Sequence, residues 1–432
     1  MKRITQYFVP LLLAIASSIS AEQLTVMTSY PQEVVSRFEE TFEHRHPEIQ
    51  LQILWRMPHD ALPYLLKPQQ GGVDVYWAPS LGNFLALKAA GALGPLGINR
   101  NGLPERIGDT LLVDPQGTFL ASETAGYGLF INPDKLAKLG VAEPKVWADL
   151  TDPHLKGEVV LPVPSGVGYA PVLVDQLLQA EGWEAGWKTW RAIAANSRLI
   201  TNRGNFVTEE VSSGRATVGL TMDFFAASSV ASGAKGKFLY PARTAFNPGQ
   251  IAITASTPRR LVAETFVTFI LSEEGQILLF HPAIRKLPVR SSVYTQAPPG
   301  YVNPFTLHVD TRYDPVRGLA RRSLNSALFD AAITRHHGTL IEVWALLHQA
   351  EVAATPKAQE TLGRARAALT ALPLSEPAPD APLALACEQR TEDIKAEAQC
   401  AAAEREWDTF FEAHYAEAKA LAAEVLRRGG RS

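Results

Sequence analysis

Short apolar strands alternate with amphipathic helices along most of the chain, and this alternation limits the fold more than any other feature. Residues 24–28 alternate like a strand, Pro31 opens a helix with its apolar side chains on one face, and residues 49–55 form the next strand. A second set of the same kind begins with a strand at residues 159–163. The pattern predicts a layered α/β protein built from two units.

An extended segment at residues 120–132 has glycine near its centre and is long enough to pass from one unit to the other. A strand at residues 251–253 indicates a return to the first unit, and residues 258–280 follow as one long helix. After about Phe305 the chain becomes a series of alanine-rich helices, whose apolar stripes we expect to pack on the protein's own core. We therefore predict a first lobe at residues 22–122 and 245–305, a second lobe at residues 123–244, and a helical C-terminal extension at residues 306–432.

The first 21 residues have the pattern of a secretory signal peptide. Lys2 and Arg3 precede an apolar run at residues 7–15, and small residues follow up to Ala21. The run is shorter than the ~20 residues of a membrane-spanning helix. We expect residues 1–21 to direct export and the product to be periplasmic.

Composition and motifs argue against two classes of protein. The chain has 41 Lys and Arg against 44 Asp and Glu, a formal charge of −3, so it lacks the basic excess of a nucleic-acid binder. It contains no Walker loop, no G-x-S-x-G and no H-E-x-x-H motif, and no histidine or acid can be assigned to Ser165 as a nucleophile. The histidines do not have the spacing of a metal site. We expect a monomer that is not an enzyme and has no cofactor and no resident metal.

Three loops follow a strand, contain small hydroxyl or glycine residues, and lead into a helix; they lie at residues 28–31, 78–82 and 164–169. Backbone N–H groups and the positive dipole end at a helix start attract anions, and a serine hydroxyl there can donate to them. An ordinary helix cap is the alternative for each serine taken alone. Because the loops are divided between two lobes, they predict an anion held in the cleft between the lobes. The candidate ligand residues in these loops are Ser29, Tyr30, Ser80, Ser165 and Gly166.

Four further residues are candidates for the same cleft. Thr124 lies at the middle of the crossing segment, where a hinge strand would touch the ligand. Asn205 and Asp223 could bind hydroxyl groups of a polar solute, and Arg243 could meet its charge. The alternatives are strand packing for Thr124, a helix cap for Asp223, and a solvated surface position for Arg243.

The chain has two cysteines, Cys387 and Cys400. On one continuous helix they would be ~20 Å apart, well beyond the ~7 Å between Cα atoms that a disulfide allows. A disulfide therefore requires a turn between them, and two free thiols are the alternative.

The order of these motifs resembles the periplasmic solute-binding proteins of ABC importers. The resemblance is carried by VDVYWAPS at residues 73–80, LFINPDKL at residues 129–136, W-x-DL-x-DP-x-LKG-x-VVLPVPSGVG at residues 147–168, and ETFVTFILSEEGQILL with LPVR at residues 264–290. It covers about residues 24–305 and implies a two-lobed type II fold that closes on a small solute and presents it to a membrane permease.

Within that superfamily the chain is similar to the branch of ferric-ion binders and their relatives that take organic phosphates. Ferric binders carry two adjacent tyrosines where this chain has Phe224 and Phe225. Phenylalanine offers no oxygen to a hard cation, so this departure argues against the usual iron site. The resemblance thus implies an ABC-importer component that captures a small anionic solute, an organic phosphate or a carboxylate. The alternatives are a ferric-iron-binding protein and a periplasmic sensor that signals occupancy to a membrane kinase.

Overall fold

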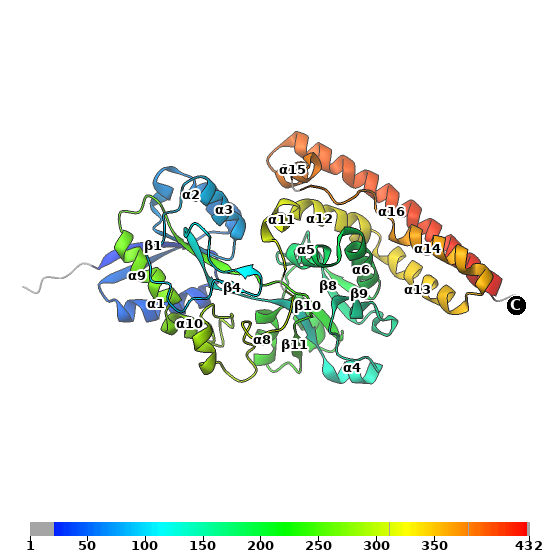
Figure 1. The fold of residues 1–432 in the computed structure, drawn as a ribbon, viewed down its shortest axis with the longest axis horizontal. Coiled ribbons are helices and arrows are strands. Elements are labelled where there is room, and N and C mark those ends of the chain that lie inside the picture. The colour runs from blue at the N-terminus through cyan, green and yellow to red at the C-terminus, as the bar shows by residue number, and fades with distance from the viewer. Residues whose placement is uncertain (1–20, 311, 379, 430–432) are drawn as a thin grey trace, which may run out of the picture.

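The computed structural model describes residues 21–310, 312–378 and 380–429. Figure 1 shows two α/β bodies side by side, with a group of long helices beside the second. Apart from Ala21, the predicted signal peptide lies outside the described residues. Within the described residues no helix is both long and apolar enough to cross a membrane.

The first sheet has the strand order β2-β1-β3-β12-β6. Its strands are β1 (Glu22–Thr28), β2 (Ile49–Trp55), β3 (Val75–Ala78), β6 (Phe119–Glu123) and β12 (Gly249–Ile253). β2, β1 and β3 run parallel, whereas β12 is antiparallel to both β3 and β6. β3, β6 and β12 are buried along their whole length. β3 is apolar throughout, whereas β6 ends with the buried Ser122 and Glu123 and β12 contains the buried Gln250.

Helices cover both faces of this sheet. One face packs on α1 (Gln32–Arg45) and α9 (Arg260–Leu271), and the other packs on α2 (Pro58–Leu65) and α3 (Leu81–Ala89). The remaining short elements of this body are η1 (Pro68–Gly72), β4 (Arg106–Ile107), β5 (Thr110–Leu111), α10 (Glu273–Leu278) and η4 (Ser291–Gln296).

The single helix predicted at residues 258–280 is wrong, because the chain forms α9 and α10 there. Ser272 separates the two helices in an extended conformation, with φ −68° and ψ 166°. Its side chain accepts a hydrogen bond from the Gly275 amide and so caps α10.

The second sheet has the order β11-β7-β10-β8-β9. Its strands are β7 (Tyr127–Ile131), β8 (Val159–Pro162), β9 (Ser197–Ile200), β10 (Val218–Met222) and β11 (Lys237–Leu239). The accompanying helices are α4 (Pro133–Leu139), η2 (Trp147–Thr151), η3 (Pro153–Leu155), α5 (Ala170–Glu181), α6 (Trp183–Ala195), α7 (Phe206–Ser212) and α8 (Asp223–Ala231). β6 belongs to the first sheet and β7 to the second, so residues 124–126 form the crossing between the two bodies.

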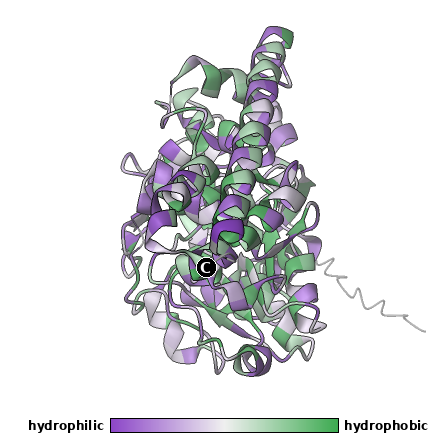
Figure 2. Ribbon diagram, turned by 90° about the vertical axis from the view of Figure 1, so that its right-hand side faces the viewer, coloured by the Kyte–Doolittle hydropathy of each residue, from purple (hydrophilic) through white to green (hydrophobic). Residues whose placement is uncertain are grey.

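The helices after Pro315 pack against the second body and share one hydrophobic core with it. They are α11 (Pro315–Ala320), α12 (Arg322–Phe329), η5 (Asp330–Thr334), α13 (His337–Ala353), η6 (Pro356–Ala358), α14 (Gln359–Thr370), α15 (Pro382–Gln389) and α16 (Ile394–Gly429). Leu324, Leu328 and Phe411 are fully buried in this core, which confirms that their stripes pack on the protein itself. Figure 2 faces these helices and shows hydrophilic residues interspersed with hydrophobic ones along them.

Buried polar contacts also hold the extension to the second body. The fully buried Arg191 of α6 donates to the backbone oxygens of Leu369, Thr370 and Ala371, at the carboxyl end of α14. These carbonyl groups lack helical partners, and the negative end of the helix dipole favours a cation there.

A disulfide joins Cys387 of α15 to Cys400 of α16, with the Cα atoms 5.1 Å apart. The chain turns at residues 390–393 between the two helices. A disulfide between these cysteines requires such a turn. The structure therefore selects the disulfide over two free thiols.

Candidate interlobe site

The strand registers place the predicted ligand loops on two facing sheet edges. In the first sheet Glu123, the last residue of β6, pairs with Gly249, and the neighbouring Gln250 pairs with Ala78, the last residue of β3. In the second sheet Met222, the last residue of β10, pairs with Tyr127, the first of β7. Both edges therefore adjoin the crossing at residues 124–126, and the loops that follow β1, β3, β8 and β10 start there.

The three predicted serines lie in these loops and are accessible. Ser29 and Ser80 are partly exposed, and Ser165 is exposed. Ser80 occupies the N-cap position of α3, yet its side chain makes no capping bond to the helix. The hydroxyl groups of Ser29 and Ser165 have no hydrogen-bond partner among the described residues. The Ser80 side chain interacts with the Tyr76 hydroxyl, and none of the three serines is buried.

Gly166 is required by the packing of its loop. A Cβ atom there would lie 1.8 Å from the backbone oxygen of Thr201, so any side chain would push the loop away from β9. Asn205 is exposed, and its amide donates to Glu209 at 2.6 Å. Gly166 is thus held close to the second sheet, whereas Asn205 is already engaged by its own helix.

Tyr30 points into the first edge and not toward solvent. Its hydroxyl donates to Oε1 of Glu123 at 2.6 Å, and both side chains are buried. Burial, followed by the neighbouring Glu123 carboxylate, raises the pKa of Tyr30 well above its usual value. A Cβ atom at Gly249 would lie 1.9 Å from the Tyr30 oxygen, so only glycine fits beside this pair.

Asp223 is buried at the second edge, where α8 begins. Its carboxylate accepts hydrogen bonds from the Gly126 amide at 2.7 Å, the Tyr240 hydroxyl at 2.8 Å and the Phe224 amide at 2.7 Å. Burial raises the pKa of Asp223 to about 6, although these hydrogen bonds act in the opposite direction. Asp223 therefore holds the backbone of the crossing at Gly126. This contact differs from both roles considered for Asp223, a ligand group and a helix cap.

Lys286 connects the two edges and was not identified from the sequence. Its Nζ lies 3.5 Å from Oε1 of Glu123 and 4.1 Å from the centre of the Phe224 ring. Its side chain is 13% exposed, so the charge is largely removed from water. The one feature of the sequence that could have indicated Lys286 is its position directly before LPVR. Leu287, the first residue of this motif, pairs with Thr124.

The crossing leaves two buried oxygen atoms without a partner in the described residues, Oγ1 of Thr124 and Oε2 of Glu123. Buried polar groups are normally hydrogen-bonded, and an unmet one costs about 1–3 kcal/mol. The end of β6 and the crossing that follows it therefore form a polar and incompletely satisfied segment.

Arg243 is located apart from these residues. It lines a cavity of about 210 Å³ together with Gln176, Asp310, Arg312 and Tyr313, and its guanidinium donates to the backbone oxygen of Ala180 at 2.7 Å. None of the other predicted ligand residues lines this cavity.

A metal site is not evident in the part of the chain that the structure describes, where no three His, Cys, Asp or Glu side chains are grouped to hold an ion. Phe224 and Phe225 lie at the start of α8 with their rings 4.2 Å apart. They present carbon atoms to each other at the position where the resemblance implies tyrosine ligands.

Comparison with known sequences identifies the family. Residues 84–301, half of the chain, match the family of bacterial extracellular solute-binding proteins. The chain belongs to this family. As a solute-binding protein it is not an enzyme, as expected from the absence of catalytic motifs.

A curated relative in this family is the phosphoglycerate transport regulatory protein PgtC of Salmonella typhimurium. It is 28% identical over 259 residues, which are 60% of this chain and 64% of PgtC. The solute-binding protein therefore spans less than two thirds of the length of this relative.

Solved structures of periplasmic binding proteins share the fold. AfuA from Actinobacillus pleuropneumoniae, with fructose-6-phosphate bound, has a TM-score of 0.54 at 21% identity and covers 67% of this chain and 91% of its own. Iron-bound HitA from Pseudomonas aeruginosa has a TM-score of 0.56 at 20% identity, over 68% of this chain and 94% of its own. These similarities confirm the predicted two-lobed type II fold, and the long helix α16 belongs to the predicted extension.

Proposed function

We propose that this solute-binding protein captures a small anionic solute, an organic phosphate or a carboxylate, in the cleft between its lobes and presents it to an ABC permease. The observation that carries the proposal is the placement of accessible serines on two facing sheet edges: Ser29 and Ser80 on one, Ser165 with Gly166 on the other. The name of PgtC, a phosphoglycerate transport regulatory protein, and the fructose-6-phosphate bound in AfuA support the same ligand class.

The energy of such a site is adequate without a large number of charges. A hydrogen bond to a charged group contributes about 1.5–3 kcal/mol, and micromolar affinity requires about 8 kcal/mol. Four or five bonds from hydroxyls and backbone amides would reach that value after the cost of closing the lobes.

We further infer that residues 22–122 and 245–305 move as one lobe and residues 123–244 as the other, with the extension at residues 306–432 carried by the second. Residues 1–21 would direct the protein to the periplasm, where it would act as a monomer. Thr124 and Asp223 would stabilise the crossing at residues 124–126, where the chain would bend when the lobes close.

Isothermal titration calorimetry of the full chain tests the proposal. The panel is 3-phosphoglycerate, fructose 6-phosphate, succinate and Fe³⁺. We expect at least one organic anion to bind with micromolar or tighter affinity and Fe³⁺ to bind weakly, because Phe224 and Phe225 supply no oxygen ligands. If Fe³⁺ bound tightly and every organic anion gave no heat, the iron alternative would replace the proposal.

A regulatory role is the second candidate, favoured by the similarity to PgtC, a transport regulatory protein. The protein would signal occupancy to a membrane kinase through the outer surface of its extension. Deleting the extension cannot test this, since Leu324, Leu328 and Phe411 belong to the core of the second body. Charge reversal at the exposed Lys419 and Glu342, which form an ion pair across α16 and α13, keeps that core intact. Loss of signalling with solute binding unchanged would support the regulatory role.

A further inference from the structure

The extension begins with a helix that reaches the first body. Figure 1 shows α11 and α12 at the top of the second body, on the side that faces α3. A Cβ atom built on Gly82 would lie 3.7 Å from Cδ2 of Leu319, so α11 contacts the start of α3. Gly82 follows Ser80 by two residues, which places this contact beside one of the predicted anion loops.

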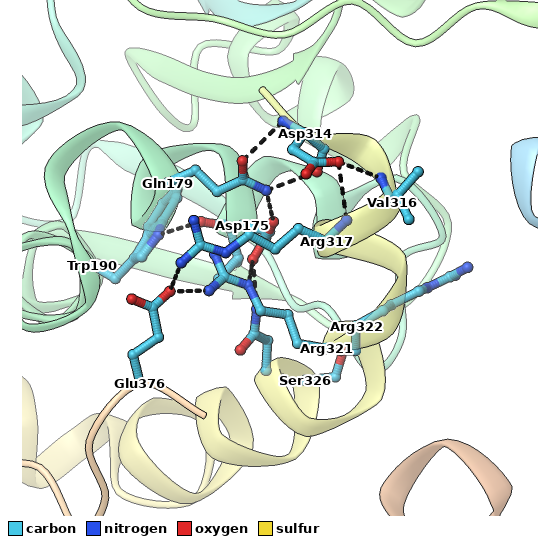
Figure 3. A network of polar contacts seen from close by, with 12 residues as sticks. Asp175, Gln179, Trp190, Asp314, Val316, Arg317, Arg321, Arg322, Ser326 and Glu376 are labelled. Atoms are coloured by element: carbon cyan, nitrogen blue, oxygen red, sulfur yellow. Dashed lines mark hydrogen bonds and ion pairs between the residues drawn. The ribbon is translucent and has the colours of Figure 1, made fainter. Parts of the chain in front are cut away.

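Buried ion pairs fix the same helix to the second body. Arg321, between α11 and α12, bonds to Asp175 of α5, and both side chains are 1% exposed. Arg321 also meets Glu376, which bonds in turn to Arg317, and Asn325 donates to Asp175 at 2.8 Å. Figure 3 shows these side chains converging between α5, α11 and α12. The position of the next residue, Arg322, is therefore set by a rigid network.

Arg322 differs from its two neighbouring arginines in having no acidic partner. Arg317 and Arg321 are neutralised by Glu376 and Asp175, whereas Arg322 forms no ion pair with any residue that the structure describes. Its side chain is exposed and extends from the start of α12 away from the buried network (Figure 3). An unpaired arginine beside two paired ones is available to an anion from outside the chain.

Arg322 follows Leu319, the α11 residue that approaches Gly82, by three residues. Burial raises the pKa of Tyr127, and the positive charge of Arg322 acts in the opposite direction. Tyr127 opens β7 and pairs with Met222 directly before Asp223. Tyr169, the N-cap residue of α5 at the end of the Ser165 loop, also acts on the pKa of Tyr127. Arg322 thus belongs to the part of the extension that adjoins the Ser80 loop of the first body, and its charge acts on Tyr127 at the start of β7.

We infer that Arg322 binds the anionic group of the solute, so that the C-terminal extension forms a third wall of the binding cleft. This inference rests on the proposed function and gives its site a cation in place of Arg243, which the sequence predicted for that role. The planar guanidinium can donate two parallel hydrogen bonds to a phosphate or a carboxylate. The serine hydroxyls and loop amides would bind the remaining oxygen atoms.

Calorimetry with 3-phosphoglycerate on three full-length proteins tests the inference: wild type, Arg322→Gln and Arg364→Gln. Arg364 is an exposed arginine of α14, so its replacement makes the same change in net charge away from the cleft. We expect Arg322→Gln to weaken binding about ten- to a hundredfold, because a charge-assisted bond is lost, and Arg364→Gln to bind within about twofold of wild type. Arg322→Lys, which keeps the charge but not the fork, should lie between wild type and Arg322→Gln.

The outcomes separate the inference from the function on which it rests. If the wild type binds 3-phosphoglycerate and Arg322→Gln binds it equally well, the extension is not part of the site and only the inference is overturned. If equal losses follow from Arg322→Gln and Arg364→Gln, the effect is one of net charge and the inference is again overturned. If neither 3-phosphoglycerate nor any other anion of the panel binds the wild type, the proposed function falls as well. Equal thermal unfolding midpoints of the variants would show that the changes do not act through folding.

Discussion

At the scale of single residues, a few buried charged side chains stabilise the crossing between the lobes. Glu123 and Lys286 face each other at the first edge, and Asp223 holds the Gly126 amide at the second. A buried carboxylate is stable only while its partners satisfy it. Changes at these positions should therefore be measured first as changes in stability.

The titration of Asp223 should be visible in the pH dependence of unfolding. Because its pKa is raised from 3.8 to about 6 in the folded protein, the folded state holds the proton more tightly than the unfolded state. The stability from this group is present at pH 4 and is lost as the pH rises through 6, an effect on the order of 2–3 kcal/mol. Asp223→Asn cannot ionise, so its free energy of unfolding relative to wild type should improve between pH 4 and 7. Denaturant unfolding at each pH measures this, and parallel pH curves would contradict it.

Gly249 should tolerate no side chain. A Cβ atom there would lie 1.9 Å from the Tyr30 oxygen and 2.4 Å from Oε1 of Glu123. We expect Gly249→Ala to lower the free energy of unfolding by about 2–4 kcal/mol, since a buried hydrogen bond must break or β12 must move. Gly363→Ala is the control, because nothing lies within 4 Å of that site on α14, and alanine should raise stability slightly. Equal unfolding midpoints for the two variants would show that the Gly249 site can relax.

At the scale of elements, the sequence predicted most strands because they are short apolar or alternating runs between helices. The strand predicted at residues 49–55 is β2, with the same bounds, and the crossing segment does pass from one sheet to the other. The broken helix after Pro258 was missed, because the cap at Ser272 interrupts a pattern that stays apolar on both sides. The contacts beside the crossing were also missed: Tyr30 and Glu123 are 93 residues apart, and no local pattern can pair them.

The disulfide between α15 and α16 should stabilise the extension and, through the shared core, the second lobe. Removing both thiols with Cys387→Ala and Cys400→Ala opens a short loop and should lower the free energy of unfolding by about 3 kcal/mol. Wild type treated with a reductant should unfold at the same lower denaturant concentration as the double variant. Identical midpoints for oxidised and reduced wild type would contradict this expectation.

At the scale of the whole molecule, the protein has a two-lobed type II fold with additional helices packed on the second sheet. The division into lobes, the ligand residues and the ligand itself stay predictions. Strand order and burial locate the two sheet edges, but they do not identify a molecule bound between those edges. The proposed function requires that both sheet edges hold the anion at the same time. A solute gripped by one lobe alone would not couple binding to closure.

The most direct test is the affinity for 3-phosphoglycerate of wild type, Ser80→Ala, Ser165→Ala and the double variant, measured by calorimetry. Ser80 belongs to the first edge and Ser165 to the second, and neither side chain is buried, so folding should be unaffected. Each single change should weaken binding by about three- to thirtyfold, and the double variant should show both losses. Affinity unchanged in both single variants, or lost only through changes in one lobe, would contradict a site built from two facing edges.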